Sequence, residues 1–268
     1  MMPIISSSEL RKINESIEKG LNEVEISLDL GLSKTIVTLS KEGFYYNNEL
    51  IKIKKIKDDD KSCYLIKDNS LVKLQFMGED TRKLYKLIPT QFRPILQVSG
   101  TSMHKKEFLE KLERDKLTGN ILDAGTGLGY SSIILSKTAD KVITIEIDNN
   151  VLEMAKLNPY SKDLFRNTNI KLIKGNIVEK IKTFKNEEFN FIIFDAGTVK
   201  GSEEFFSLEN YKEAYRVLKN KGRLYHYLPK HQIKRGRDFG SEVTNRLKKA
   251  GFKQIYRDKL GSYIITLK

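Results

Sequence analysis

The hydrophobic positions of this chain follow two different periods, and the change between them divides the sequence. Residues 8–19 carry apolar side chains every three or four positions, with Gly20 after them, which predicts a short amphipathic helix. Further on, apolar and polar residues alternate, as they do in strands with one buried face. Such strands are expected over 24–30, 34–39, 50–56, 63–66 and 71–76. The pattern therefore predicts a small antiparallel β domain over residues 1–82.

Two further segments, one within this domain and one after it, need a separate interpretation. Ile and Lys alternate over 51–57, which a half-buried strand with a solvated lysine face explains better than a phosphate-binding stripe does. Residues 83–104 contain Pro89 and Pro94, and proline interrupts regular structure. We therefore expect 83–104 to be an irregular connector that leads to a second domain.

Beyond residue 104 the pattern alternates between helical and strand periods. Helices are expected over 105–115, 128–138, 149–157, 176–184, 203–219 and 239–250. Strands are expected over 119–123, 141–147, 170–174, 190–195, 222–228, 252–257 and 261–267. Alternation of this kind builds a doubly wound α/β sheet with helices on both faces, so residues 105–268 are predicted to form one such domain.

A glycine-rich turn joins the first of these strands to the next helix. Residues 120–132 are N-I-L-D-A-G-T-G-L-G-Y-S-S, with Gly125, Gly127 and Gly129 at every second position. Glycine has no Cβ, so the backbone can turn tightly and a ligand can lie against its amides. The following strand ends near Glu146, about twenty residues further on, where a carboxylate can accept from a ribose. These features together predict a nucleoside-binding βαβ unit.

The glycine spacing distinguishes between the nucleosides that are held in this way. A dinucleotide fingerprint would place its third glycine at Tyr130, one position later than Gly129. With Asp123 ahead of the turn, residues 120–268 resemble the class I S-adenosylmethionine-dependent methyltransferases. Further motifs of that family follow in order: Glu146, Gly175-Asn176, Phe194-Asp195-Ala196 and residues 215–224. Short motifs also occur at 87–90 (L-I-P-T), 99–104 (S-G-T-S-M-H), 158–159 (N-P), 223–227 (R-L-Y-H-Y) and 235–238 (R-G-R-D). On these motifs, residues 84–268 are similar to a family of predicted archaeal methyltransferases of undefined substrate.

The resemblance implies a fold and a set of cofactor contacts. The fold is a Rossmann-like, doubly wound methyltransferase sheet of seven strands, whose last two strands form a hairpin at one edge. The cofactor is S-adenosylmethionine, and its expected contacts are Asp123, Gly125, Thr126, Gly127, Gly129, Glu146, Asn176 and Asp195. The glycines would approach its methionine part, Glu146 its ribose hydroxyls and Asn176 its adenine.

Methyl transfer is an in-line displacement, so the protein must position a nucleophile and remove one proton. Asp195 is the leading catalytic candidate, because it ends the strand 190–195; alternatively it only caps the loop that follows. Related enzymes that methylate amino groups often continue with Pro-Pro and an aromatic residue, whereas Ala-Gly-Thr here argues against an exocyclic base amine. His226 and His104 could carry a proton near neutral pH, or could be packed residues. We expect no metal site.

Composition and charge indicate where the protein resides and which kind of partner it binds. The single cysteine, Cys63, excludes an internal disulfide, and no apolar run approaches the ~20 residues of a membrane span. A cytoplasmic protein is therefore expected. The net charge is +13, and +10 of it falls in residues 220–268. A basic patch favours a polyanion such as structured RNA, although a solvated lysine-rich face is the alternative.

The expected RNA contacts lie where the fifth strand of the second domain ends. Tyr225 and Tyr227 could stack on a base, and Lys234, Arg235 and Arg237 could contact phosphates. Other functions remain open from the sequence. The chain could methylate a small molecule or a protein, transfer an aminopropyl group on a similar fold, or bind RNA without catalysis.

Overall fold

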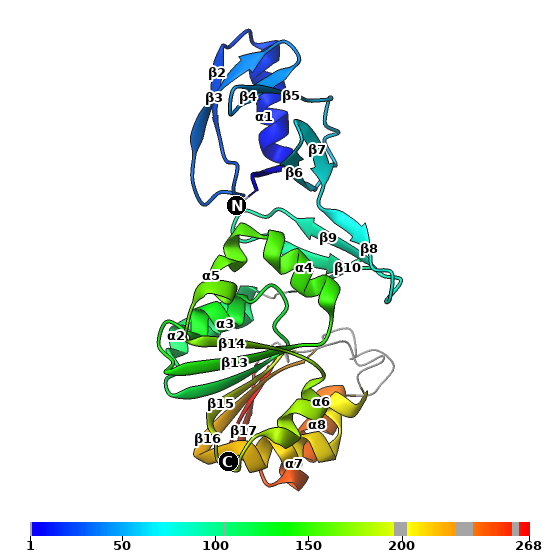
Figure 1. Cartoon of the computed structure of the whole chain (residues 1–268). Helices are drawn as coiled ribbons and strands as arrows, with labels where there is room; N and C mark the ends of the chain where they lie inside the picture. Colours follow the sequence, from blue (N-terminus) through cyan, green and yellow to red (C-terminus); the bar gives the residue numbers. More distant parts are fainter. Residues whose placement is uncertain (1, 104–105, 196–202, 229–237, 259–262) are drawn as a thin grey trace. The chain divides into compact units, whose positions relative to one another are not determined.

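The computed structural model describes residues 2–103, 106–195, 203–228, 238–258 and 263–268 (Figure 1). The chain forms two compact units. The first contains residues 1–104 and 153–162, and the second contains residues 105–152 and 163–268. Among the described residues, no helix is long and apolar enough to span a bilayer.

The first unit is built from short antiparallel strands and one N-terminal helix. Its elements are β1 (Ile4–Ser6), α1 (Ser7–Glu18), β2 (Glu23–Ile26), β3 (Thr35–Ser40), β4 (Gly43–Tyr46), β5 (Glu49–Lys52), β6 (Cys63–Lys67), β7 (Ser70–Lys73), β8 (Gln75–Met77), β9 (Leu84–Ile88), β10 (Ile95–Val98) and β11 (Thr101–Ser102). They pair as three sheets, in the orders β1-β6-β7, β2-β3-β4-β5 and β11-β10-β9-β8. The expected antiparallel β region is therefore confirmed.

Helix α1 packs one face into a hydrophobic core of this unit. The Ser6 side chain caps the helix by accepting from the Glu9 amide at 3.2 Å. Leu10 and Ile13, three positions apart, are fully buried and pack with apolar residues of the strands around them, such as Phe44. The helical period of the sequence thus marks the face that the sheets cover.

The expected irregular connector over 83–104 is wrong. Residues 84–88 and 95–98 form the paired strands β9 and β10, and β11 adds to their sheet. Pro89 and Pro94 lie between the two strands, so they end each strand at a turn rather than exclude strands. The expected strand over 50–56 is shorter than predicted, because β5 ends at Lys52.

The second unit has the alternating order that the sequence predicts. The elements of this part of the chain are α2 (Lys106–Asp115), β12 (Asn120–Ala124), α3 (Tyr130–Leu135), β13 (Lys141–Glu146), α4 (Asn149–Leu157), α5 (Lys162–Arg166), β14 (Ile170–Lys174), α6 (Ile177–Lys180), β15 (Phe189–Phe194), α7 (Leu208–Val217), β16 (Leu218–Tyr227), α8 (Phe239–Ala250), β17 (Lys253–Arg257) and β18 (Tyr263–Leu267). Short 3-10 turns lie at Pro159–Ser161, Ile181–Thr183 and Glu203–Phe206. The end of α4, from residue 153, and the turn Pro159–Ser161 belong to the first unit.

These strands form one seven-stranded sheet, in the order β14-β13-β12-β15-β16-β18-β17. The first five are parallel, whereas β18 is antiparallel to both β16 and β17. The two last strands of the chain thus form a hairpin at one edge, with β18 inserted next to β16. The expected seven-stranded, doubly wound α/β fold is confirmed.

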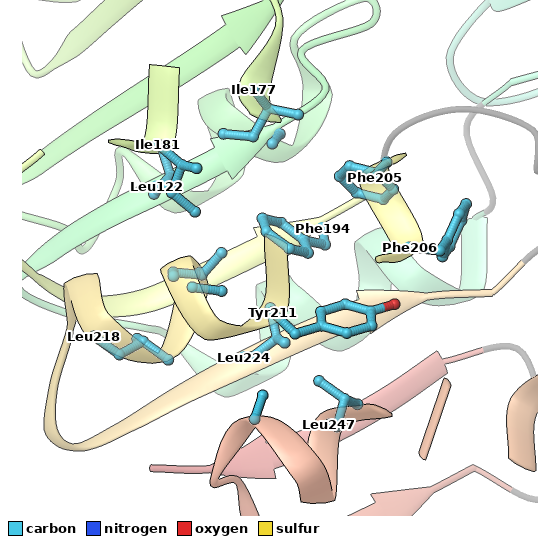
Figure 2. Close-up of a cluster of buried hydrophobic side chains, with 14 of the residues drawn as sticks. Leu122, Ile177, Ile181, Phe194, Phe205, Phe206, Tyr211, Leu218, Leu224 and Leu247 are labelled. Atoms are coloured by element: carbon cyan, nitrogen blue, oxygen red, sulfur yellow. The ribbon is translucent and has the colours of Figure 1, made fainter. Parts of the chain in front are cut away.

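Helices cover both faces of the sheet (Figure 1). On one face, side chains of α6, α7 and α8 pack on alternate residues of the central strands. Figure 2 shows Leu122, Phe194 and Leu224 of three adjacent strands in this cluster, with Tyr211 of α7 and Leu247 of α8. On the other face, α3 and α2 pack beside one another, and Tyr225 of β16 donates to Asp115 of α2.

Candidate active site

The carboxyl ends of the parallel strands meet at one edge of the sheet. Ala124 pairs with Ile145 and with Phe194, and Phe194 pairs with His226. One position further on, this register aligns Gly125, Glu146, Asp195 and Tyr227 across four adjacent strands. A hydrogen bond of 2.5 Å from the Asp195 amide to the Ala124 carbonyl continues the alignment. The sequence places these residues far apart, and the parallel topology brings them into one row.

Asp123 organises the glycine turn from inside the fold. Its Oδ2 accepts from Ser131 at 2.7 Å and from Ser132, both in the first turn of α3. Its Oδ1 is buried and has no hydrogen-bond partner among the described residues. Burial raises the pKa of this carboxyl to about 6, although the serine hydrogen bonds oppose the shift. The turn therefore contains a buried acid with one unused acceptor.

Two glycines of the turn are needed for backbone conformation, and one of them also for close packing. Gly127 and Gly129 have φ angles of 56° and 81°, which side chains with a Cβ rarely adopt. A Cβ on Gly129 would lie 2.7 Å from Leu164, so this glycine also permits close packing. Thr126 is buried, and its hydroxyl lies 2.7 Å from that of Thr144. Its amide donates to the Ile145 carbonyl at 3.1 Å and its carbonyl accepts from the Gly129 amide at 2.8 Å, so Thr126 braces the turn through both its side chain and its backbone.

Glu146 ends β13, as expected, and turns its carboxylate toward the glycine turn. Oε2 accepts from the Gly127 amide at 2.9 Å, and Oε1 accepts from the Ile147 and Asp148 amides at 3.0 Å each. A carboxylate offers about four acceptor directions, so one remains, on Oε2. Burial raises the pKa of Glu146, against the effect of these three amides. The group is thus both a brace for the turn and an acceptor for one further donor.

Three residues near Glu146 complete this side of the edge: Gly175, Asn176 and Ile147. Asn176 caps α6, because its Oδ1 accepts from the Val178 amide at 3.0 Å. Gly175 donates its amide to the Glu146 carbonyl at 2.8 Å and so ties β14 to β13. Ile147 is 62% exposed, although it follows a buried strand. Ile147 was not among the expected site residues, although an apolar residue directly after the acid that ends the strand was a visible signal.

Asp195 and Tyr227 stand on the adjacent ends of β15 and β16. Asp195 is half-buried. Burial, together with the charge of Asp195, raises the pKa of the Tyr227 hydroxyl to about 12. The Tyr227 ring lies 6.0 Å from that of Phe108 in α2. Asp195 is therefore placed where a group bound at this edge could reach it, with a neutral phenol beside it.

The predictions for His226 and Tyr225 need correction. His226 is fully buried; its Nδ1 donates to the Phe194 carbonyl at 3.2 Å, and its Nε2 accepts from Tyr211 at 2.9 Å. Burial lowers its pKa to about 4, and both ring nitrogens are already hydrogen-bonded inside the fold, so neither can exchange a proton with a bound ligand. Tyr225 is 2% exposed and donates to Asp115, so its ring is not available to stack on a base. Both residues support the fold.

The remaining candidates lie outside the described residues: His104, Lys234, Arg235 and Arg237. The structure does add Ser131, Ser132 and Thr144, which hold the turn. The adjacent serines at the start of a helix were a visible signal for an acid in contact with them. Among the described residues, no group of three or more metal-ligating side chains could hold an ion.

Comparisons with known proteins bear on the family and the fold of the chain. A sequence model described as a methyltransferase domain matches residues 115–258. An uncharacterized protein of Methanocaldococcus jannaschii is 37% identical over 226 residues, which cover 81% of this chain and 77% of that protein. The solved structure of a spermidine synthase in complex with the transition-state analogue AdoDATO has a TM-score of 0.57 at 19% identity, and the match covers 72% of this chain and 73% of that one.

The spermidine synthase of Thermotoga maritima gives a similar result. Its TM-score is 0.54 at 19% identity, and the match covers 72% of this chain and 71% of that one. Sequence identities this low establish a shared fold alone.

Proposed function

Because the chain belongs to the class I methyltransferase family, we propose that it transfers the methyl group of S-adenosylmethionine to structured RNA. The observation that carries the cofactor assignment is the Glu146 carboxylate, held beside the Gly127 amide at the strand ends. The location of the positive charge supports the RNA substrate.

The residues of the sheet edge fit this cofactor. Glu146 retains one acceptor direction for a ribose hydroxyl, and the exposed Ile147 side chain can cover the face of a purine. The buried carboxyl of Asp123 would attract a cationic amino group bound near the turn by its charge. When bound, S-adenosylmethionine supplies a methyl group on a positively charged sulfur, which makes the methyl carbon electrophilic.

The part left to the chain is to orient the acceptor and to take its proton. Asp195 lies on the strand next to the glycine turn, and its half-buried carboxylate can accept a hydrogen bond from the acceptor and hold the proton. Tyr227 stays neutral at physiological pH and can donate a hydrogen bond or cover a bound base. The loss of Asp195 should therefore affect turnover more than cofactor binding.

RNA as substrate is supported by the charge of residues 220–268. In the described part of this region, Lys248, Lys249 and Lys253 are exposed and have no carboxylate partner. The most basic stretch, residues 230–237, directly follows the strand end that carries Tyr227. A polyamine substrate would instead favour carboxylates. Aminopropyl transfer is not favoured, because the matching family model is that of a methyltransferase.

The salt dependence of RNA binding tests the substrate proposal. The triple variant K234A/R235A/R237A removes three possible phosphate contacts, so the log–log slope of affinity against salt should flatten by about 2. Calorimetry should show unchanged S-adenosylmethionine affinity, because none of the three residues is a cofactor contact. If the wild type binds no RNA at low salt, or if the variant keeps the wild-type slope, RNA is the wrong substrate class for this patch. A small molecule or a protein would then be the better candidate.

A further inference from the structure

A cleft of about 440 Å³ lies within the first unit. One part of its lining comes from the sheet β11-β10-β9-β8, and the other from residues 57–61 and β7. The cofactor assignment and the basic C-terminal region use none of these residues. The cleft is therefore an independent feature of the chain.

The register of the sheet orders the floor of the cleft. Lys86 pairs with Gln97, and Gln97 pairs with Ser102, so three polar side chains stand in one row across three strands. Strands lie about 4.8 Å apart, so the row extends over about 10 Å. Two positions along and on the same face, Ile88 pairs with Ile95. The floor thus combines a row of hydrogen-bonding side chains with an apolar pair, Ile88 and Ile95, beside it.

The rim of the cleft is basic. Lys57 and Lys61 are exposed, and neither has a carboxylate partner among the described residues. Lys73 is already paired with Asp60 at 2.8 Å. Besides that ion pair, the lining contains three further lysines, Lys57, Lys61 and Lys86, and one further acidic residue, Asp59.

Helix α1 fixes the segment that carries the rim. Arg11 donates to the Lys57 carbonyl at 3.0 Å and to the Asp60 carbonyl at 3.1 Å. Ser7 donates to the same Asp60 carbonyl at 2.7 Å. The backbone between the two rim lysines is therefore held before any ligand arrives, which lowers the ordering cost of binding.

We propose that this cleft binds a segment of single-stranded RNA. The phosphates would lie against Lys57, Lys61 and Lys86, and a base would lie on Ile88 and Ile95, with its polar edge toward the Gln97 amide. An acidic peptide could pair with the lysines. A nucleotide fits the lining better, because it combines a negative charge with a flat apolar face for Ile88 and Ile95 and a polar edge for the Gln97 amide. This inference rests on the proposed RNA substrate and assigns part of its binding to the first unit.

The test measures binding of a short, fluorescently labelled single-stranded RNA to full-length protein over a range of salt concentrations. The variant K57A/K61A/K86A should lose roughly 10- to 100-fold in affinity near 0.1 M salt, and its salt slope should flatten by about 2. The matched control is K19A/K41A/K67A, which removes the same charge from exposed lysines that do not line the cleft. It should bind as the wild type does. The variant K57R/K61R/K86R should keep the wild-type slope, because arginine also neutralises phosphate.

The outcomes separate this inference from the proposed function. Equal losses in the cleft variant and its control would overturn the cleft assignment, since only net charge would then matter. RNA binding that is lost only in K234A/R235A/R237A would also overturn it while leaving the RNA substrate in place. A wild type that binds no RNA would refute both. Labelled polyglutamate that binds the wild type and not K57A/K61A/K86A, together with RNA binding that is equal in the two proteins, would assign the cleft to an acidic peptide instead.

Discussion

Replacing Glu146 by glutamine probes the cofactor site with a minimal change of shape. The substitution turns one carboxylate oxygen into an NH2 group and removes the charge. Oε1 accepts from the Ile147 and Asp148 amides and Oε2 from Gly127, so the remaining oxygen is best placed toward the pair of amides. The new NH2 group then faces the Gly127 amide and the direction that we assign to a ribose hydroxyl.

The magnitude follows from these contacts. One charge-assisted hydrogen bond to the ribose contributes about 1.5–3 kcal/mol, so S-adenosylmethionine affinity should weaken by roughly 10- to 150-fold. The Gly127 amide also loses its acceptor, at about 1–3 kcal/mol of stability. The loss of a buried charge offsets part of this cost, because burial already raises the pKa of Glu146. The variant should therefore fold, with a modest fall in Tm.

Isothermal titration calorimetry at neutral pH measures this effect, and a thermal melt confirms folding. The matched control is Glu179→Gln, the same chemical change on an exposed residue of α6 whose ion pair, within the part of the chain that the structure describes, is with Lys182. The control should bind as the wild type does. A folded E146Q protein with wild-type affinity would refute the assignment of Glu146 to the ribose.

Three further predictions concern catalysis and pH. Asp195→Ala should lower methyl transfer to RNA by at least about 100-fold while cofactor affinity stays within a few-fold; a folded variant that no longer binds cofactor would instead make Asp195 a cofactor contact. The pKa of Asp123 is raised from 3.8 to about 6, so the free energy of unfolding should fall by about 3 kcal/mol as pH rises through this range. Urea melts of Asp123→Asn should not show this fall. The pKa of His226 is lowered from 6.5 to about 4, so stability is lost as pH falls through that range, by an amount similar to that for Asp123. His226→Phe should remove this loss, so that the opposite pH dependence caused by Asp123 becomes visible. An unchanged pH profile would show that the buried imidazole is not the group that titrates.

The second domain could be predicted because its strands are buried and its helices regular. In β12 and β15, apolar runs end at turn or acidic residues, and the alternation with helices permits only one class of sheet. The first domain was harder, because its strands are short and exposed on one face. Between β9 and β10, two prolines suggested an irregular connector, although proline is compatible with the turn that joins two strands.

The site was predicted as far as the backbone motif determines it. Glu146 and the glycines follow from spacing, because a turn and a strand end have local signals. Tyr225, His226 and Tyr227 are consecutive on one strand, so they point alternately to opposite faces, and only the helices packed on each face decide which side chain is covered. Tertiary packing therefore decides their exposure: Tyr225 and His226 are buried in the core, and Tyr227 lies half-buried at the edge.

The most direct test of the whole account is methyl transfer itself. Total RNA from a strain that lacks this gene would be incubated with the purified protein and S-adenosylmethionine that carries a deuterated methyl group, and the nucleosides would be analysed by mass spectrometry. We expect the heavy methyl group on one nucleoside with wild-type protein and none with the Asp195→Ala variant. Protein that is folded and binds S-adenosylmethionine, yet labels no nucleoside in that RNA, would contradict the proposal that RNA is the acceptor.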